Sequence, residues 1–98
     1  MARTPEGKVK DKVVAILKDM GAYYFFPATH GYGRSGVPDI VCCLNGQFVG
    51  IECKANGNKA TPLQIREIEA IRMAGGIAMI VDETNLDMLE ARLRGVKQ

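Results

Sequence analysis

The step from Asn45 to Gly46 constrains the fold of this sequence more than any other feature. It stands between two runs, 37–44 and 47–55, that are rich in β-branched, aromatic and thiol-bearing residues. An Asn-Gly pair between such runs is typical of a two-residue hairpin turn, because both residues tolerate a positive φ. We therefore expect these two runs to form an antiparallel hairpin.

The register of this hairpin decides which side chains meet. With a two-residue turn Leu44 pairs with Gln47, and stepping away from the turn pairs Asp39 with Glu52. Side chains alternate along a strand, so Lys54 shares a face with both carboxylates. At a separation of ~5 Å and an effective dielectric of about 20, two carboxylates repel by on the order of 3 kcal/mol. A shared proton, Lys54 or a bound divalent cation could offset this repulsion. We favour the cation, because Lys54 supplies one positive charge against two negative ones.

Two alternatives to this cation site stay open at the level of sequence. The acids could form a surface-exposed cluster in which Lys54 bridges them and nothing binds. A bulge or a longer turn would instead move Asp39 to the opposite face from Glu52. The expected register gives the second face of the hairpin an apolar set made of Ile40, Cys42, Leu44, Val49, Ile51 and Cys53.

The remaining sequence predicts three helices and two more strands. Thr61, Pro62 and Gln64 have the pattern of an N-cap, a first helical residue and a capping box. The expected elements are a helix at 6–20, strands at 22–26, 37–44 and 47–55, a helix that opens at 61 and runs up to Gly75, a strand at 77–81 and a helix at 86–93. The stripe expected to be buried on the second helix is Leu63, Ile65, Ile68, Ile71 and Met73. This order, α-β-β-β-α-β-α, predicts an α/β fold with a mixed four-stranded sheet flanked by helices.

Length and composition place the chain among ordinary globular proteins. Its 98 residues fit one domain, 1–98, with 47% hydrophobic and 24% charged residues. No apolar run approaches the ~20 residues of a membrane-spanning helix, and the first residues contain no apolar signal segment, so we expect a cytoplasmic protein without a membrane partner. The 3 cysteines lack C-x-x-C spacing, so we expect reduced, packed thiols.

Basic residues are unevenly distributed along the chain. The segment 53–66 contains Lys54, Lys59 and Arg66 and no acid, and the segment 1–18 has more basic than acidic residues. Solvated helix faces would explain both segments, and so would binding to a polyanion. The residues that could follow a phosphate backbone are Lys8, Lys10, Lys12, Arg34, Lys59 and Arg66.

The acidic pair lies within a longer pattern. The run Gly36-Val37-Pro38-Asp39-Ile40-Val41 followed by Glu52-Cys53-Lys54 resembles the PD-(D/E)XK nuclease signature. The strand F-V-G-I-E-C-K-A, the helix start K-A-T-P-L-Q and the later G-G-I-A-M-I-V are similar to the virus-type replication-repair nuclease (VRR-NUC) family. The resemblance implies a restriction-endonuclease-like core and a kinship with archaeal Holliday junction resolvases.

The resemblance also implies a role for individual residues. Asp39, Glu52 and the main-chain carbonyl of Cys53 would be metal ligands, and Lys54 would orient or deprotonate the attacking water. Gln64 matches the family's glutamine, although capping of Thr61 also explains it. Two further assignments have alternatives in the chain. Glu6 matches the acid that the family often places on the first helix, with Asp11 as a nearby alternative. His30 could serve as the general base of a different, one-metal nuclease, and the alternative that we favour is a solvent-exposed loop histidine.

For the whole protein, the resemblance implies a homodimeric, structure-selective DNA endonuclease that uses Mg²⁺, with Mn²⁺ able to substitute. Its substrate would be branched DNA, with a four-way (Holliday) junction among the candidates, and its setting would be DNA repair in a bacterial or phage-infected cell. Two alternatives remain from other classes of protein. One is a DNA-binding module that has lost turnover, and the other is a small α/β interaction domain without a nucleic-acid partner.

Overall fold

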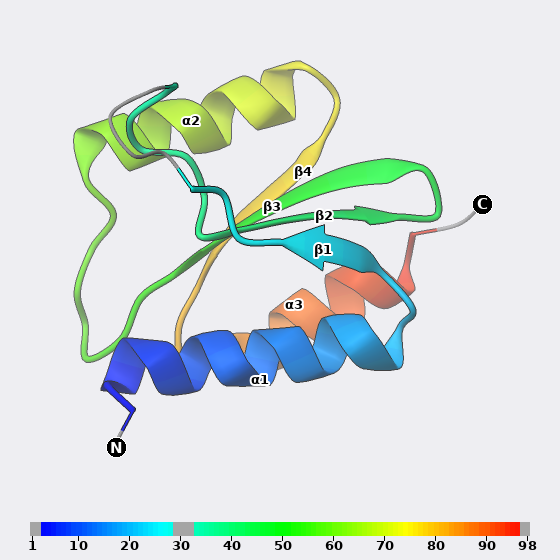
Figure 1. The fold of residues 1–98 in the computed structure, drawn as a ribbon, viewed down its shortest axis with the longest axis horizontal. Helices are drawn as coiled ribbons and strands as arrows, with labels where there is room; N and C mark the ends of the chain where they lie inside the picture. Colours follow the sequence, from blue (N-terminus) through cyan, green and yellow to red (C-terminus); the bar gives the residue numbers. More distant parts are fainter. Residues whose placement is uncertain (1–2, 29–32, 97–98) are drawn as a thin grey trace.

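The computed structural model describes residues 3–28 and 33–96. The order of elements along the chain is the expected one (Figure 1). The elements are α1 (Pro5–Asp19), β1 (Tyr23–Phe25), β2 (Ile40–Leu44), β3 (Gln47–Cys53), α2 (Pro62–Met73), β4 (Ile77–Val81) and α3 (Leu86–Arg94). The α/β class is confirmed. None of the helices in the described ranges is long and apolar enough to cross a membrane.

The hairpin turn has the expected geometry and register. Asn45 and Gly46 adopt φ values of 53° and 82°, as a two-residue primed turn requires. Antiparallel pairing between β2 and β3 runs from Leu44 with Gln47 to Ile40 with Ile51. The expected start of the strand at 37 was wrong, because β2 begins three residues later.

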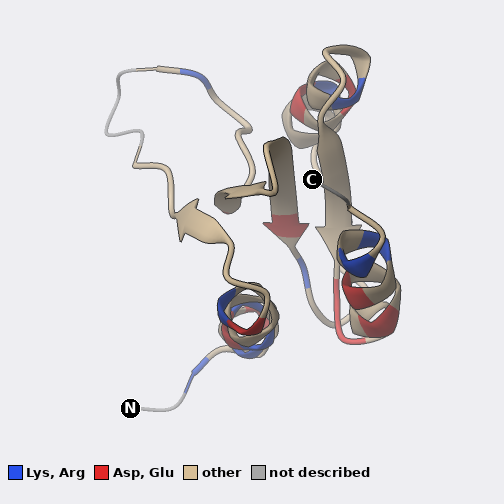
Figure 2. Ribbon diagram, turned by 90° about the vertical axis from the view of Figure 1, so that its right-hand side faces the viewer, with Lys and Arg blue, Asp and Glu red and all other residues tan. Residues whose placement is uncertain are grey.

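The four strands form one mixed sheet in the order β1-β2-β3-β4. The pairs β1–β2 and β2–β3 are antiparallel, and β4 runs parallel to β3. The helices α1 and α3 lie side by side on one face of this sheet, and α2 lies on the other (Figure 1). Acidic and basic residues are interspersed on α1 and α3, whereas the strands carry little charge (Figure 2).

The core lies between the sheet and the α1–α3 layer. Val9, Val13 and Leu17, which follow one another at helical spacing on α1, are buried against the strands. The apolar face expected for the hairpin is also confirmed, since all of its members are buried: Ile40, Cys42, Leu44, Val49, Ile51 and Cys53. Cys42 and Cys53 are therefore packed thiols, but Cys43 is exposed, which corrects the expectation of three packed cysteines.

The buried stripe expected on α2 was wrong in part. Ile68 is buried, whereas Leu63, Ile65 and Met73 are 44%, 42% and 89% exposed. This helix lies mainly over β4 and the edge of β3, so only a narrow strip of it faces the sheet. Within that strip the helix approaches closely: a Cβ added at Gly50 of β3 would stand 2.8 Å from Ile71.

Candidate active site

Several element ends meet at one end of the molecule. The C-terminal end of β3 and the N-terminal ends of α1 and α2 lie on the side opposite the β2–β3 turn (Figure 1). Helix N-termini carry partial positive charge, which favours nearby carboxylates. The predicted acids lie here, because Asp39 directly precedes β2 and Glu52 is the penultimate residue of β3.

Asp39 is fixed by a hydrogen bond to the neighbouring strand. The backbone N–H of Cys53 donates to Asp39 Oδ2 at 2.9 Å, so the carboxylate takes the place of a ladder acceptor just beyond the last paired residues. This bond holds Asp39 beside the end of β3. The negative charge of the Asp39 carboxylate raises the pKa of Glu52. The structure thus brings the two acids together, as the register predicted.

Glu52 is a buried carboxylate that is only partly satisfied. Its exposure is 2%, and Oε2 lies 3.4 Å from Lys54 Nζ. Oε1 is buried without a hydrogen-bond partner among the described residues. Burial and, to a smaller extent, the charge of Asp39 raise the pKa of Glu52 to about 7, although Lys54 opposes the shift. The alternative of a surface-exposed cluster was therefore wrong, because the central acid is not on the surface.

Gln64 uses its side-chain amide in two directions. Its Oε1 accepts from the Thr61 N–H at 2.8 Å, which completes the capping box of α2. Its Nε2 donates to Glu52 Oε2 at 2.9 Å. The capping interpretation is thus confirmed, and the same amide also contacts the buried carboxylate of Glu52.

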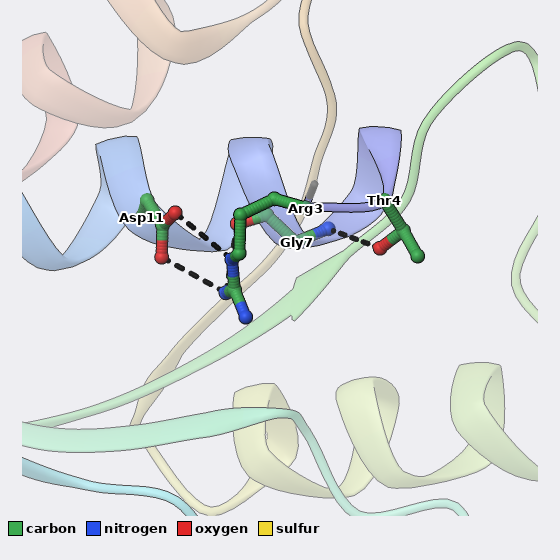
Figure 3. Close-up of polar contacts among 4 residues, drawn as sticks. All are labelled: Arg3, Thr4, Gly7 and Asp11. Carbon is green, nitrogen blue, oxygen red and sulfur yellow. Dashed lines mark hydrogen bonds and ion pairs between the residues drawn. The ribbon is translucent and has the colours of Figure 1, made fainter. Parts of the chain in front are cut away.

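The two acids considered on α1 have different surroundings. Glu6 lies in the first turn of α1, and its charge contributes to the raised pKa of Glu52. Asp11 accepts from Arg3 at 3.1 and 2.9 Å, and Arg3 also donates to the Gly7 carbonyl (Figure 3). Asp11 is therefore committed to a surface ion pair, whereas Glu6 lies within electrostatic reach of the site.

The donor set fits a hard cation that keeps bound waters. No three His, Cys, Asp or Glu side chains within 3–28 and 33–96 form a ready-made metal cluster. Two carboxylates, Asp39 and Glu52, are nevertheless enough for Mg²⁺, which binds proteins through one or two carboxylates and retains water. The unpartnered Glu52 Oε1 is the observation that favours such a ligand, because a buried oxygen without a partner is costly.

The residues expected to bind a phosphate backbone are all at the surface, but they are not equally available. Lys8, Lys12 and Lys59 are exposed. Arg34 donates two hydrogen bonds of 3.0 Å to Glu67, and Arg66 lies 3.9 Å from the same carboxylate. His30, the alternative base, lies outside the described residues.

A cleft of about 370 Å³ opens beside the acids. Asp39 and Gln64 line it from the site side, and Lys10, Phe26 and Arg34 line it from α1, the end of β1 and the following segment. A water molecule or a phosphate group could therefore approach Asp39 from solvent.

Sequence reasoning missed two residues around this cleft. Glu67 is buried on α2, where it anchors Arg34. An acid between Ile65 and Ile68, within the apolar face of a helix, was the available signal. Phe26 was assigned only to a strand, although it lies beyond the end of β1 and lines the cleft.

Comparisons with known proteins agree with this geometry. No family model matches the sequence. The chain is 33% identical over 87 residues to a protein named "Putative nuclease p44" from Acyrthosiphon pisum secondary endosymbiont phage 1, and the match covers 86% of this chain and 89% of that protein. Its fold matches a solved structure described as a VRR_NUC domain, with a TM-score of 0.76, 23% identity and coverage of 97% of this chain and 100% of that one. The chain therefore belongs to the same family as this phage protein, and it has the fold of a VRR_NUC domain.

Within this VRR_NUC-like fold the expected signature forms a spatial unit. Asp39, Glu52 and Lys54 come from two adjacent strand ends, and Gln64 joins them from the helix that follows. Asp39 and Gln64 line the solvent-accessible cleft, and the buried Glu52 lies behind them in contact with Gln64 and Lys54.

Proposed function

We propose that this protein is a divalent-metal-dependent DNA endonuclease whose site consists of Asp39, Glu52 and Lys54. One observation supports the proposal most strongly. Glu52 is buried next to a second carboxylate, and its Oε1 has no partner among the described residues. A structural carboxylate would be expected to satisfy both oxygens, whereas a metal ligand must keep one of them available. Membership of a family with a phage relative named as a nuclease supports the same activity.

Each residue would have a distinct part in hydrolysis. Asp39, Glu52 and the Cys53 carbonyl would hold Mg²⁺ or Mn²⁺, which when bound lowers the pKa of water and neutralises phosphate charge. Lys54 carries an ammonium group at the same carboxylate and would orient the attacking water and stabilise negative charge on the phosphate. Gln64 fixes the orientation of Glu52 through Oε2 and so leaves Oε1 for the ion. Glu6 adds negative charge that favours a cation.

For the substrate we propose DNA with a branched structure, a four-way junction among the candidates, bound by a homodimer. Two sites related by two-fold symmetry would cut two strands. Exposed Lys8, Lys12 and Lys59 support binding to the phosphate backbone. An apolar groove of about 560 Å³ between α2 and the sheet supports self-association, because its lining includes Val41, Phe48 and Ile71.

Cleavage assays test the activity. Purified protein is incubated with labelled four-way junction, flap and linear duplex DNA in Mg²⁺, Mn²⁺ or EDTA. We expect cleavage in Mg²⁺ and Mn²⁺ with branched DNA preferred, none in EDTA, and a loss of about 100-fold or more in Lys54→Ala. Arg92→Ala, which removes an exposed cation from α3, is the matched control and should cleave like the wild type.

Three results would contradict the proposal. Cleavage that persists in EDTA, or that is undiminished in Lys54→Ala, would mean that the site is misassigned. Salt-dependent DNA binding without cleavage would identify a binding module that has lost turnover. Absence of both DNA binding and a divalent-dependent change in Tm would identify an interaction domain.

A further inference from the structure

Phe26 forms a ridge between two hollows in the surface. One is the cleft beside Asp39 and Gln64, and the other is a groove of about 910 Å³ along α1. Phe26 and Lys10 line both hollows. Whatever enters the cleft and continues into the groove must therefore pass this aromatic ring and this lysine.

The ring is both exposed and held in place. Phe26 is 50% exposed, although burial is the usual state of a phenylalanine. The ring of Tyr24 meets it edge-on with centroids 6.0 Å apart, and Lys10 Nζ lies 5.3 Å from its centroid. A half-open ring fixed by two neighbours is preorganised to receive another flat group.

The groove on the far side of the ridge has a positive character. Lys10 and Lys18 line it, and neither makes an ion pair with a described residue. Arg3 also lines it, but its charge is matched by Asp11 (Figure 3). Two uncompensated lysines beside an exposed ring combine attraction for phosphate with a surface for stacking.

Phe25 shows that an exposed aromatic ring at this end of β1 does not necessarily lie beside Lys10 and the cleft. It is the preceding residue and is 48% exposed, which is nearly the same as Phe26. It lines the apolar groove on the α2 side, together with Val41 and Phe48, and it does not line either hollow beside Lys10. The chain thus provides a matched aromatic control one position away.

We infer that Phe26 and Lys10 form a subsite for one unpaired nucleotide of DNA, with the base stacked on the ring and the adjoining phosphate near the lysine. The inference rests on the proposed function, in that it takes DNA as the substrate. Bases inside a duplex have both faces covered by their neighbours, so they cannot offer a face to Phe26, whereas an unpaired base can. The subsite therefore makes the protein favour DNA in which a single strand leaves a duplex.

The test measures binding in EDTA, where the proposed hydrolysis does not occur. The probes are a duplex with a short single-stranded arm that carries 2-aminopurine beside the duplex, and the same duplex fully paired. Stacking quenches 2-aminopurine, so we expect quenching with wild-type protein and with Phe26→Tyr. We expect Phe26→Leu to lose the quenching and to bind the arm-bearing probe about 10-fold more weakly, while binding to the paired duplex changes less than about two-fold. Phe25→Leu, which leaves Phe26 and Lys10 in place and keeps an apolar side chain in its own groove, should quench 2-aminopurine as the wild type does.

The inference is overturned if Phe26→Leu weakens binding to both probes equally, or if Phe25→Leu has the same effect as Phe26→Leu.

A second measurement does not require the leucine variant to fold. Wild-type protein is cross-linked by light to an arm that carries 5-iodouracil, and the attachment site is mapped by mass spectrometry. Attachment to Phe26 supports the subsite, and attachment elsewhere contradicts it. Because no metal or cleavage is involved, failure of the subsite is distinguishable from failure of the proposed hydrolysis.

Discussion

At the scale of single residues, Gln64 links helix capping to the chemistry of the site. Its amide accepts from the cap residue of α2 and donates to Glu52. Gln64→Glu would keep the acceptor for the cap, but it would remove the donor and place a third carboxylate beside Asp39 and Glu52. Gln64→Ala would remove both contacts.

We therefore expect the two substitutions of Gln64 to differ in stability while both impair cleavage. Gln64→Ala should lower the free energy of unfolding by about 1 kcal/mol at any pH through loss of the cap. Gln64→Glu should be destabilising at pH 8 and much less so at pH 5, because like charges repel only when ionised. Urea unfolding at both pH values measures this difference. An equal effect of the two substitutions at pH 8 and pH 5 would show that the contact with Glu52 is unimportant.

The raised pKa of Glu52 predicts that the stability of the metal-free protein depends on pH. Its folded pKa of about 7 lies above the ordinary value of 4.5, so the folded chain binds this proton more tightly than the unfolded chain does. The protonated Glu52 therefore contributes up to about 3 kcal/mol to the free energy of unfolding. This contribution is fully present below pH 4.5 and is lost as the pH rises through 7. Urea unfolding between pH 4.5 and 8 measures it, and Glu52→Gln should flatten the profile. A profile unchanged by Glu52→Gln would assign the effect to another group.

We expect Asp39 to lower the stability of the metal-free protein, although the proposed hydrolysis requires this residue. Asp39→Asn keeps an oxygen that can accept from the Cys53 N–H, but it removes the charge that raises the pKa of Glu52. We expect Tm to rise without metal, by the equivalent of about 1 kcal/mol, and cleavage to be lost. Thermal unfolding in EDTA and the cleavage assay measure the two effects. A lower Tm in Asp39→Asn would mean that the carboxylate stabilises the folded chain.

At the scale of elements, the segment before β2 is shaped by contact with α2. Gly36 has a φ of +81°, and a Cβ there would stand 2.6 Å from the backbone carbonyl of Leu63. The Arg34–Glu67 ion pair holds the same segment against the same helix. Asp39 follows three residues later, so its position depends on this contact.

We therefore expect Gly36→Ala to lower the free energy of unfolding more than an alanine substitution at another glycine with a positive φ. Gly33 is the matched control, because its φ is +93° and an added Cβ would meet none of the described residues within 4 Å. We expect Gly33→Ala to cost about 1 kcal/mol of unfolding free energy, and Gly36→Ala to cost at least about 2 kcal/mol more and to reduce cleavage. Urea unfolding of both variants measures the difference. Equal costs would mean that the segment moves away from α2 without penalty.

The hairpin could be predicted from sequence because its determinants are local. A two-residue Asn-Gly turn fixes the register, and the register fixes which side chains face one another. The capping box of α2 was predictable for the same reason, since Thr61 and Gln64 lie within one turn. The contact between Gln64 and Glu52 could not be derived, because it depends on where α2 docks on the sheet.

The buried face of α2 was mispredicted because helical spacing reports which residues share a side, and it does not report how much of that side is covered. The helix covers a narrow strip of the sheet, so Leu63 and Ile65 remain largely exposed. Glu67 was missed because its hydrogen-bond partner, Arg34, lies far away in sequence. Long-range pairing of this kind leaves little trace in local patterns.

At the scale of the whole molecule, the apolar groove beside α2 predicts self-association. Phe48 is 47% exposed in that groove, and Met88 is 66% exposed on α3, on the other face of the sheet. We expect the wild-type protein to sediment as a dimer, Phe48→Glu to sediment as a monomer with an unchanged circular dichroism spectrum, and Met88→Glu to remain dimeric. Sedimentation equilibrium measures all three. A monomeric wild-type protein, or a dimer that persists in Phe48→Glu, would exclude this groove as the interface.

The shared amide of Gln64 also bears on how a newly made chain matures. The early hairpin already contains Asp39, Glu52 and Lys54, but Glu52 gains its amide donor only when α2 has formed and docked. In the proposed mechanism, the site would thus be complete only after α2 has docked on the sheet. In the proposed nuclease, a partly folded chain would carry both acids without the amide that orients Glu52, and it would therefore not yet cut the nucleic acid around it.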